Sequence, residues 1–158
     1  MIRDVCASTR KQIELDNKFC IETLASEPRI VAATDLVKMS LALIEAAMSN
    51  ATKTRDYAKK LLKQPGLKPD NIYVMQQCDR GYFSCYMSFW SALRETQEKE
   101  YDYASYDIKI AFTDNVDWCR NALTSKKVND EVLSRGNEFI FVFGAVAFVT
   151  LDLLPSED

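Results

Sequence analysis

The placement of five cysteines constrains the fold of this 158-residue chain more than any other feature. Cys6 and Cys20 lie close together in a short N-terminal stretch, whereas Cys78 and Cys119 fall in two separate long segments of helical pattern. In an oxidising compartment, two bridges would close an N-terminal hairpin and clamp one long helix to another. With any one cysteine left out and three ways to pair the others, about fifteen two-bridge arrangements exist. Among these, a Cys6–Cys20 bridge is favoured because it is local.

The absence of histidine limits the chemistry that the chain can perform. Ser-His-Asp and Cys-His nucleophile systems, histidine acid–base catalysis and histidine-ligated zinc are all excluded. Asp114 and Asp117 share one helical face, whereas a glycosidase needs two carboxyl groups that approach from opposite sides of a cleft. No Walker loop, dinucleotide fingerprint or metal-ligand cluster is present. We therefore expect a protein that is not an enzyme and that has no cofactor and no metal site.

Composition and charge favour a single globular domain. Hydrophobic residues make up 47% of the chain and charged residues 27%, and only four glycines and four prolines occur, too few for a many-stranded sandwich. The net charge of −3, without a long basic run, gives no argument for nucleic-acid binding. We expect one domain over residues 1–158, with an N-terminal hairpin over about 1–28 and a helical bundle over about 34–154.

Apolar residues recur at helical spacing in four long segments. The first helix should begin at Thr34 as its N-cap and end at Pro65-Gly66, and Pro69 should open the second. Asp102 can cap the third, and the fourth should cover Val132–Leu154. Strict steps of three and four define the inward seam of the second helix: Met75, Cys78, Tyr82, Cys85, Phe89, Ala92 and Thr96. The pattern predicts an all-α, up-down-up-down four-helix bundle.

The N-terminal segments Ile2–Thr9 and Asn17–Leu24 predict two short helices around a polar turn. Neither is long enough to be stable alone in water. A Cys6–Cys20 bridge would close a loop of about 15 residues and contribute about 3 kcal/mol in the chain-entropy model. That contribution would make the hairpin stable as an appendage of the bundle.

Neither a membrane span nor a secretory signal is visible. The most apolar stretch, Phe139–Leu151, is shorter than the roughly 20 residues that a span needs, so we expect a helix buried in the bundle. The chain opens directly on polar helical sequence, which indicates either a cytosolic protein or a mature secreted form with an added Met1. The cysteines favour secretion, and Asn50-Ala51-Thr52 is a candidate glycosylation site at Asn50.

Tyrosines gather between the second and third helices, in the run Tyr101-Asp102-Tyr103-Ala104-Ser105-Tyr106. Aromatic residues at such a junction are good interface anchors, because they present a large area at a low entropy cost. Alternatively, Tyr103 and Tyr106 begin the apolar stripe of the third helix and only Tyr101 is exposed. The pattern leaves both interpretations open.

A series of residues in fixed order spans nearly the whole chain: Cys6-x-x-Thr9, Phe19-Cys20-x-x-x-Leu24-x-x-x-Pro28, Cys78-x-x-x-Tyr82, Tyr103-Ala104-Ser105, Ala111-x-x-Asp114, Cys119 and Leu153-Leu154. Together they resemble the plant invertase inhibitor and pectin methylesterase inhibitor family. The resemblance implies an N-terminal hairpin on a four-helix bundle, with bridges Cys6–Cys20 and Cys78–Cys119. It leaves Cys85 as a free thiol, which its place on the inward seam predicts to be buried and inert.

Members of this family have no catalytic site and instead bind and block an enzyme. The resemblance therefore implies a secreted plant inhibitor of a cell-wall or vacuolar invertase, found in the apoplast or alternatively the vacuole, or else of a pectin methylesterase. We expect a monomer. A different class of interpretation is a carrier that holds an apolar ligand in a bundle core lined by Phe89, Phe141, Phe143 and Phe148.

A short sequence element near the start of the third helix distinguishes the subgroups of this family. Invertase inhibitors carry a Pro-Lys-Phe element there, whereas this chain has Asp102-Tyr103-Ala104. Asp102-Tyr103-Ala104-Ser105 and Asp114-x-x-x-x-Cys119 are instead similar to an invertase-inhibitor branch that includes pollen allergens. Pectin methylesterase inhibitors use a broader surface of the second and third helices. The expected partner-binding residues are Tyr101, Asp102, Tyr103, Ser105 and Tyr106, on a rigid helical pair that blocks the enzyme's cleft.

Overall fold

The computed structural model describes residues 1–155 and contains only helices within that range. The elements in chain order are α1 (Ile2–Gln12), α2 (Asn17–Ala25), α3 (Pro28–Val31), α4 (Leu36–Leu62), α5 (Pro69–Gln97), α6 (Tyr101–Ile110), the π-helical segment η1 (Ala111–Asn115), α7 (Val116–Lys126) and α8 (Glu131–Asp152). The all-α class is therefore confirmed.

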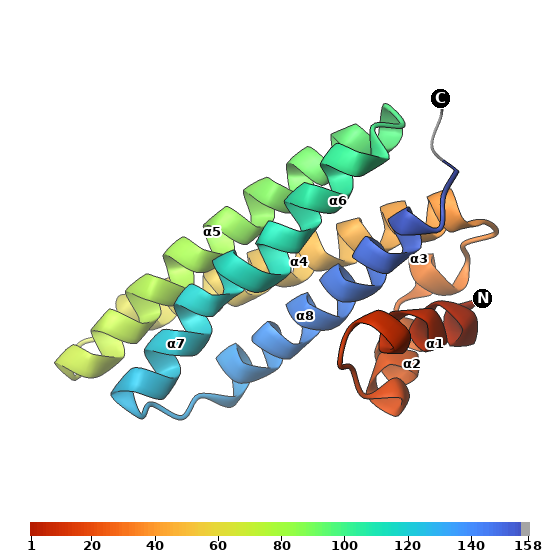
Figure 1. The fold of residues 1–158 in the computed structure, drawn as a ribbon. Helices are drawn as coiled ribbons and strands as arrows, with labels where there is room; N and C mark the ends of the chain where they lie inside the picture. Colours follow the sequence, from red (N-terminus) through yellow and green to blue (C-terminus); the bar gives the residue numbers. More distant parts are fainter. Residues whose placement is uncertain (156–158) are drawn as a thin grey trace.

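Four rods form an up-down-up-down bundle, as the sequence pattern predicts (Figure 1). Helix α4 packs against α5 and α8, and α5 packs against the third rod, which is the continuous run α6–η1–α7. The α1–α2 hairpin lies outside the bundle, beside α8. Two disulfides complete this architecture, one in the hairpin and one between α5 and α7.

The helix starts differ from two of the predicted N-caps. Asp35, not Thr34, caps α4, because its carboxylate accepts a hydrogen bond of 2.8 Å from the backbone N–H of Lys38. The third rod starts at Tyr101, with Glu100 at the N-cap position, so Asp102 lies in the first turn instead of capping the helix. Before it, Lys99 has a φ of 63° and Glu100 donates its N–H to the Glu95 carbonyl, which is a Schellman-type end to α5.

The inward seam predicted for the second helix forms the centre of the core. All seven of its residues are buried on α5. The Tyr82 hydroxyl on this seam donates to the side-chain oxygen of Asn137 on α8, and both residues are buried. Gly136 packs beside the same pair, because a Cβ at Gly136 would stand 3.0 Å from the Tyr82 hydroxyl. This polar contact fixes the register of α8 against α5.

Helix α8 is the most apolar rod. Among the described residues, it alone is long and apolar enough to cross a membrane by length and composition, and 61% of that window is buried inside the bundle. Its start is fixed by Asp130, which accepts from the Leu133 N–H at 2.9 Å. The Tyr57 hydroxyl on α4 also donates to Asp130, at 2.8 Å, so this carboxylate joins the start of α8 to α4.

Candidate functional site

The two disulfides join the cysteines that the family resemblance implies. Cys6–Cys20 holds α1 to α2 with a Cα–Cα distance of 5.9 Å, and Cys78–Cys119 holds α5 to α7 with a Cα–Cα distance of 4.1 Å. The second bridge links residues 41 positions apart in sequence. It therefore makes α5 and the third rod one stiff unit, on which a binding surface can be presented without rearrangement.

Close backbone approach beside this bridge depends on Gly81. A Cβ at Gly81 would stand 2.7 Å from the Asn115 carbonyl oxygen and 3.2 Å from the Cβ of Trp118. Asn115 ends the π-helical segment η1, and its side-chain amide donates to Ser88 at 3.0 Å. The π-helical turn therefore contacts α5 at both Gly81 and Ser88. The sequence pattern did not predict this turn.

Cys85 is the one free cysteine and is fully buried. Its thiol donates to the Ala111 carbonyl at 3.3 Å, where η1 begins. Burial raises the pKa of the Cys85 thiol far above its usual range. The thiol therefore has a structural contact and very little thiolate character, which is the environment of an unreactive cysteine.

The tyrosine-rich junction lies at the end of the bundle where α5 passes into α6. Tyr103 and Tyr106 are each 66% exposed, whereas Tyr101 is half-buried and packs against the core. The alternative in which only Tyr101 is exposed is therefore wrong. Asp102 is exposed beside the two tyrosines. Ser105 is only 9% exposed and its hydroxyl donates to Asp152 on α8 at 3.4 Å, so little of its surface is open to a partner; the contact set itself stays a prediction.

Two carboxyl groups face each other just inside this junction. Glu95 on α5 lies beside Asp107 on α6, and one oxygen of Glu95 is buried without a hydrogen-bond partner among residues 1–155. Desolvation, followed by the charge of Asp107, raises the pKa of Glu95 to about 7. Burial also raises the pKa of Asp107. At acidic pH the pair therefore holds a proton that it loses near neutrality.

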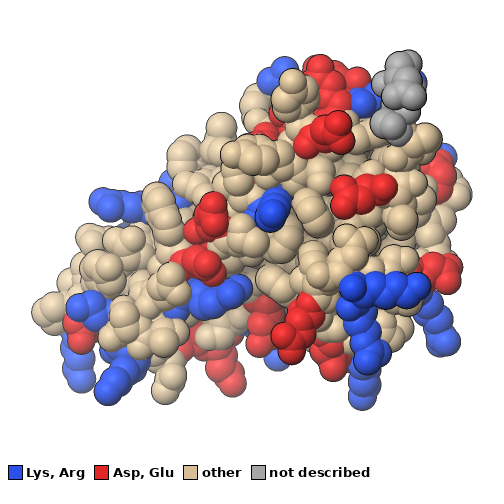
Figure 2. All heavy atoms as spheres, viewed as in Figure 1, with Lys and Arg blue, Asp and Glu red and all other residues tan. Residues whose placement is uncertain are grey.

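Acidic side chains gather around this end of the bundle, and Figure 2 shows them over the junction between α5 and α6. Glu98 and Glu100 precede α6 and are exposed, as is Asp102 in its first turn. The two exposed tyrosines therefore stand beside an acidic rim, in which Glu98 is paired with Arg94 at 3.8 Å. Such a surface is complementary to a partner with a basic patch around an apolar recess.

The outer face of α5 carries a second exposed apolar surface, which the sequence analysis missed. Phe83, Met87 and Trp90 are all exposed and follow steps of four and three. Arg55 stacks over the Phe83 ring at 4.7 Å, and Arg94 lies over Trp90 at 5.1 Å. The signal was present in the sequence, since these residues repeat with helical spacing on the side of α5 opposite to its buried seam.

Three further predicted features have definite places in the structure. Asp114 is exposed on η1, whereas the Asp117 carboxylate on α7 pairs with Arg120 at 3.4 Å. Asn50 is half-buried and its amide donates to the Gly136 carbonyl at 3.0 Å; its glycosylation stays a prediction. Within residues 1–155, no group of three or more cysteine, aspartate or glutamate side chains is placed to hold a metal ion.

The phenylalanines named for a ligand-binding core pack on one another or on other core residues. Phe89 and Phe143 are buried in the main core cluster. Phe141 and Phe148 both pack on Phe112. The centroid of the Phe112 ring lies 5.7 Å from that of Phe141 and 6.1 Å from that of Phe148. These contacts give the carrier interpretation no support.

Comparisons with known proteins agree with this architecture. The family model described as plant invertase/pectin methylesterase inhibitor matches residues 1–142. The Arabidopsis thaliana protein named "Cell wall / vacuolar inhibitor of fructosidase 2" is 31% identical over 104 residues, which cover 66% of this chain. The matched stretch spans 57% of the length of that relative.

Two solved structures share the fold over nearly the whole chain. The crystal structure of mutant form A of a pectin methylesterase inhibitor from Arabidopsis superposes with a TM-score of 0.86, covering 99% of this chain and 98% of that one. A crystal structure of a pectin methylesterase inhibitor from Arabidopsis thaliana gives a TM-score of 0.74, covering 99% and 97%. Both are 17% identical to this chain, so this likeness concerns the fold alone.

Proposed function

Because this chain belongs to the plant invertase/pectin methylesterase inhibitor family, we propose that it is a secreted inhibitor that docks on a cell-wall or vacuolar invertase. It acts as a binding protein and not as an enzyme. The relative that matches over 66% of this chain is named as a cell wall and vacuolar inhibitor of fructosidase. That name supports invertase as the first target to test, and the apoplast or vacuole as the compartment.

The observation that carries the proposal is the exposed pair Tyr103 and Tyr106 at the end of a clamped helical unit. Large aromatic side chains that remain in water in the free protein are the usual energetic centres of protein interfaces. Their backbone belongs to α6, which continues through η1 and α7 to the Cys78–Cys119 bridge. Docking therefore orders few groups, which favours tight binding.

The mechanism is steric. The end of the bundle presents Tyr103, Tyr106 and the acidic rim, with the bulk of the helical bundle behind them. A partner whose cleft accepts the tyrosines is therefore covered by the rest of the bundle end. Substrate access is lost without any chemistry in the inhibitor.

A pectin methylesterase is the alternative target. The outer face of α5, with Phe83, Met87 and Trp90, gives the second helix an extended apolar surface. A partner that binds along the length of the helical pair would use this face, whereas a partner that takes the bundle end into its cleft would use the tyrosines. The two targets therefore predict different sets of sensitive residues.

Mixing experiments separate the candidates. Purified invertase and purified pectin methylesterase are each incubated with the oxidised protein between pH 4 and pH 7, and residual activity is titrated against inhibitor concentration. We expect invertase activity to fall to a plateau at about one inhibitor per enzyme, with pectin methylesterase unaffected. Loss of methylesterase activity alone, sensitive to Phe83→Ala/Trp90→Ala, would instead establish the alternative. Unchanged activity of both enzymes would refute the proposal.

A further inference from the structure

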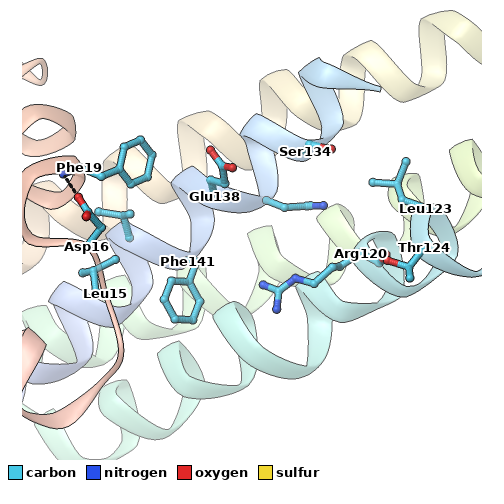
Figure 3. Close-up of a pocket in the computed structure, with 11 residues that line it drawn as sticks. Leu15, Asp16, Phe19, Arg120, Leu123, Thr124, Ser134, Glu138 and Phe141 are labelled. Atoms are coloured by element: carbon cyan, nitrogen blue, oxygen red, sulfur yellow. Dashed lines mark hydrogen bonds between the residues drawn. The ribbon is translucent and has the colours of Figure 1, made fainter. Parts of the chain in front are cut away.

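A groove of about 650 Å³ lies between the N-terminal hairpin and the bundle (Figure 3). Its walls come from the start of α2, from α7 and from the first half of α8. Arg120 lines it from α7, whereas Trp118 leaves the same helix in nearly the opposite direction, toward α5. The groove is walled by α7, whereas the exposed tyrosines lie on α6 at the other end of the third rod, so the two sites are separate (Figure 1). The size of the groove is typical of a small-molecule site.

Asn137 supplies an unused donor at this groove. The residue is only 6% exposed, and its side-chain oxygen accepts the hydroxyl proton of Tyr82. Its amide nitrogen has no hydrogen-bond partner within the described part of the chain, and the residue lines the groove. Among the described residues this nitrogen is not one of the fully buried unpaired polar atoms, so it is open to the groove and can donate to an acceptor atom of a ligand.

The two sides of the groove carry complementary polar groups. Arg120 extends into it from α7, and its guanidinium pairs with Asp117 on its own helix at 3.4 Å. Glu138 and Ser134 line it from α8, one turn apart, and both are exposed. Donors and an acceptor therefore face the same space, and the opposite formal charges of Arg120 and Glu138 disfavour a strongly charged ligand.

Half-buried aromatic rings supply the apolar surface. The Phe19 ring stacks on Phe139 at 6.2 Å, and the Phe141 ring meets Phe112 edge-on at 5.7 Å. Both Phe19 and Phe141 also line the groove (Figure 3). Each ring is thus held in place by another phenylalanine while part of its surface remains available to a ligand.

We propose that this groove binds a small neutral ring compound with several hydroxyl groups, such as a monosaccharide, a disaccharide or a simple glycoside. A hydroxyl group both donates and accepts, so the hydroxyl groups of such a ring can donate to Glu138 and accept from Asn137 on the α8 side, and accept from Arg120 on the α7 side. The C–H face of the ring packs on Phe19 and Phe141. An organic acid would meet the carboxylates of Glu138 and Asp16, and a cation would meet Arg120.

Chemical-shift mapping tests the site directly. Sugars stabilise most folded proteins at high concentration by exclusion from their surface, so a melting shift alone is not informative. Glucose, sucrose and phenyl β-glucoside are titrated into the isotope-labelled oxidised protein, and the side-chain amide of Asn137 and the rings of Phe19 and Phe141 are followed. We expect saturating shifts confined to these groups with at least one of the three probes.

Two conservative surface variants supply the decisive comparison. Arg120→Gln and Glu138→Gln are each expected to weaken binding of that probe about tenfold, because each removes a charge-assisted hydrogen bond. Arg135→Gln is the matched control, since Arg135 is exposed on α8 and does not line the groove. Shifts that rise linearly without saturation, or equal affinities in the first two variants and the control, would overturn the proposal. Tighter binding of benzoate than of any sugar would overturn the ligand class.

Discussion

Gly81 on α5 lies so close to Asn115 on the third rod that a Cβ at Gly81 would stand 2.7 Å from the Asn115 carbonyl oxygen. The same stretch of α5 carries Cys78, whose bridge to Cys119 brings the two backbones to a Cα–Cα distance of 4.1 Å. Glycine is therefore required at position 81 by the spacing of the rods, and the stiffness of the proposed docking unit depends on that contact.

Gly81→Ala is expected to lower the free energy of unfolding by about 1–3 kcal/mol, because the blocking atom belongs to the backbone and cannot rotate away. Denaturant unfolding of the oxidised protein measures the change. Ser84→Ala, on the next turn of α5, is the control and should leave the midpoint nearly unchanged, since it adds no atom. Equal midpoints for Gly81→Ala and the parent protein would show that α5 and the third rod separate without cost.

Removal of the inter-helix bridge is expected to cost more stability than any surface substitution. The 41-residue separation of Cys78 and Cys119 corresponds to about 4 kcal/mol in the chain-entropy model. The double variant Cys78→Ala/Cys119→Ala should therefore unfold at a clearly lower denaturant concentration. The matched pair Cys6→Ala/Cys20→Ala removes about 3 kcal/mol by the same model and leaves the docking unit clamped. Invertase inhibition should survive the hairpin variant better than the bundle variant.

The Cys85 thiol is expected to be silent toward thiol reagents in the folded protein. It is fully buried, its pKa is raised by burial, and it donates to the Ala111 carbonyl. Ellman's reagent should report no thiol in native buffer and one thiol per chain in guanidinium chloride without reductant. Rapid native labelling would contradict the packing of η1 against α5. More than one thiol after unfolding would contradict the two bridges.

Stability is expected to fall as the pH rises through the titration of Glu95. Its pKa is 4.5 in the unfolded reference and about 7 in the folded protein, so between these values the folded state holds the extra proton. The stabilising contribution is complete below pH 4.5 and is lost as the pH passes 7. The raised pKa of Asp107 contributes in the same direction. The charge of Glu100 adds to the upward shift of the Glu95 pKa, whereas the charge of Arg94 opposes it.

Glu95→Gln tests this pH dependence. At pH 8 the variant should unfold at a higher denaturant concentration than the parent protein. The difference between the two midpoints should shrink as the pH falls toward 4.5. Denaturant midpoints at pH 4.5, 6 and 8 measure it. Glu14→Gln, at an exposed position before α2, serves as the control. A constant difference across this range would rule out a shared proton between α5 and α6.

The sequence predicted the bundle because its strongest signals are local and periodic. The seam from Met75 to Thr96 on α5 is buried throughout, since residues three and four apart must share a helical face. The start of α4 was misplaced by one residue because Thr34 and Asp35 are both good N-cap residues. Only the observed hydrogen bond from Lys38 distinguishes them.

The candidate site was less predictable because it depends on how the rods pair. Lys99 takes the left-handed conformation that glycine usually marks, so no sequence signal located the start of α6 at Tyr101. The exposure of Tyr103 therefore could not be decided. The Glu95–Asp107 pair joins residues on different helices, which a local pattern does not bring together. The π-helical turn η1 is a local backbone change that has no signature in the amino-acid composition.

The central claim is that the tyrosine-bearing end of α6 contacts the target enzyme. The ratio of inhibition constants between a variant and the parent protein tests this claim most directly. The inhibition constant against invertase is measured for Tyr103→Ala/Tyr106→Ala and for Tyr73→Ala, an exposed tyrosine at the other end of α5 that packs on Lys126. Equal unfolding midpoints establish that both variants are folded. We expect the double variant to bind about 30-fold or more weakly, as two interface anchors require, and Tyr73→Ala to match the parent protein. Equal inhibition constants for all three proteins would contradict the account.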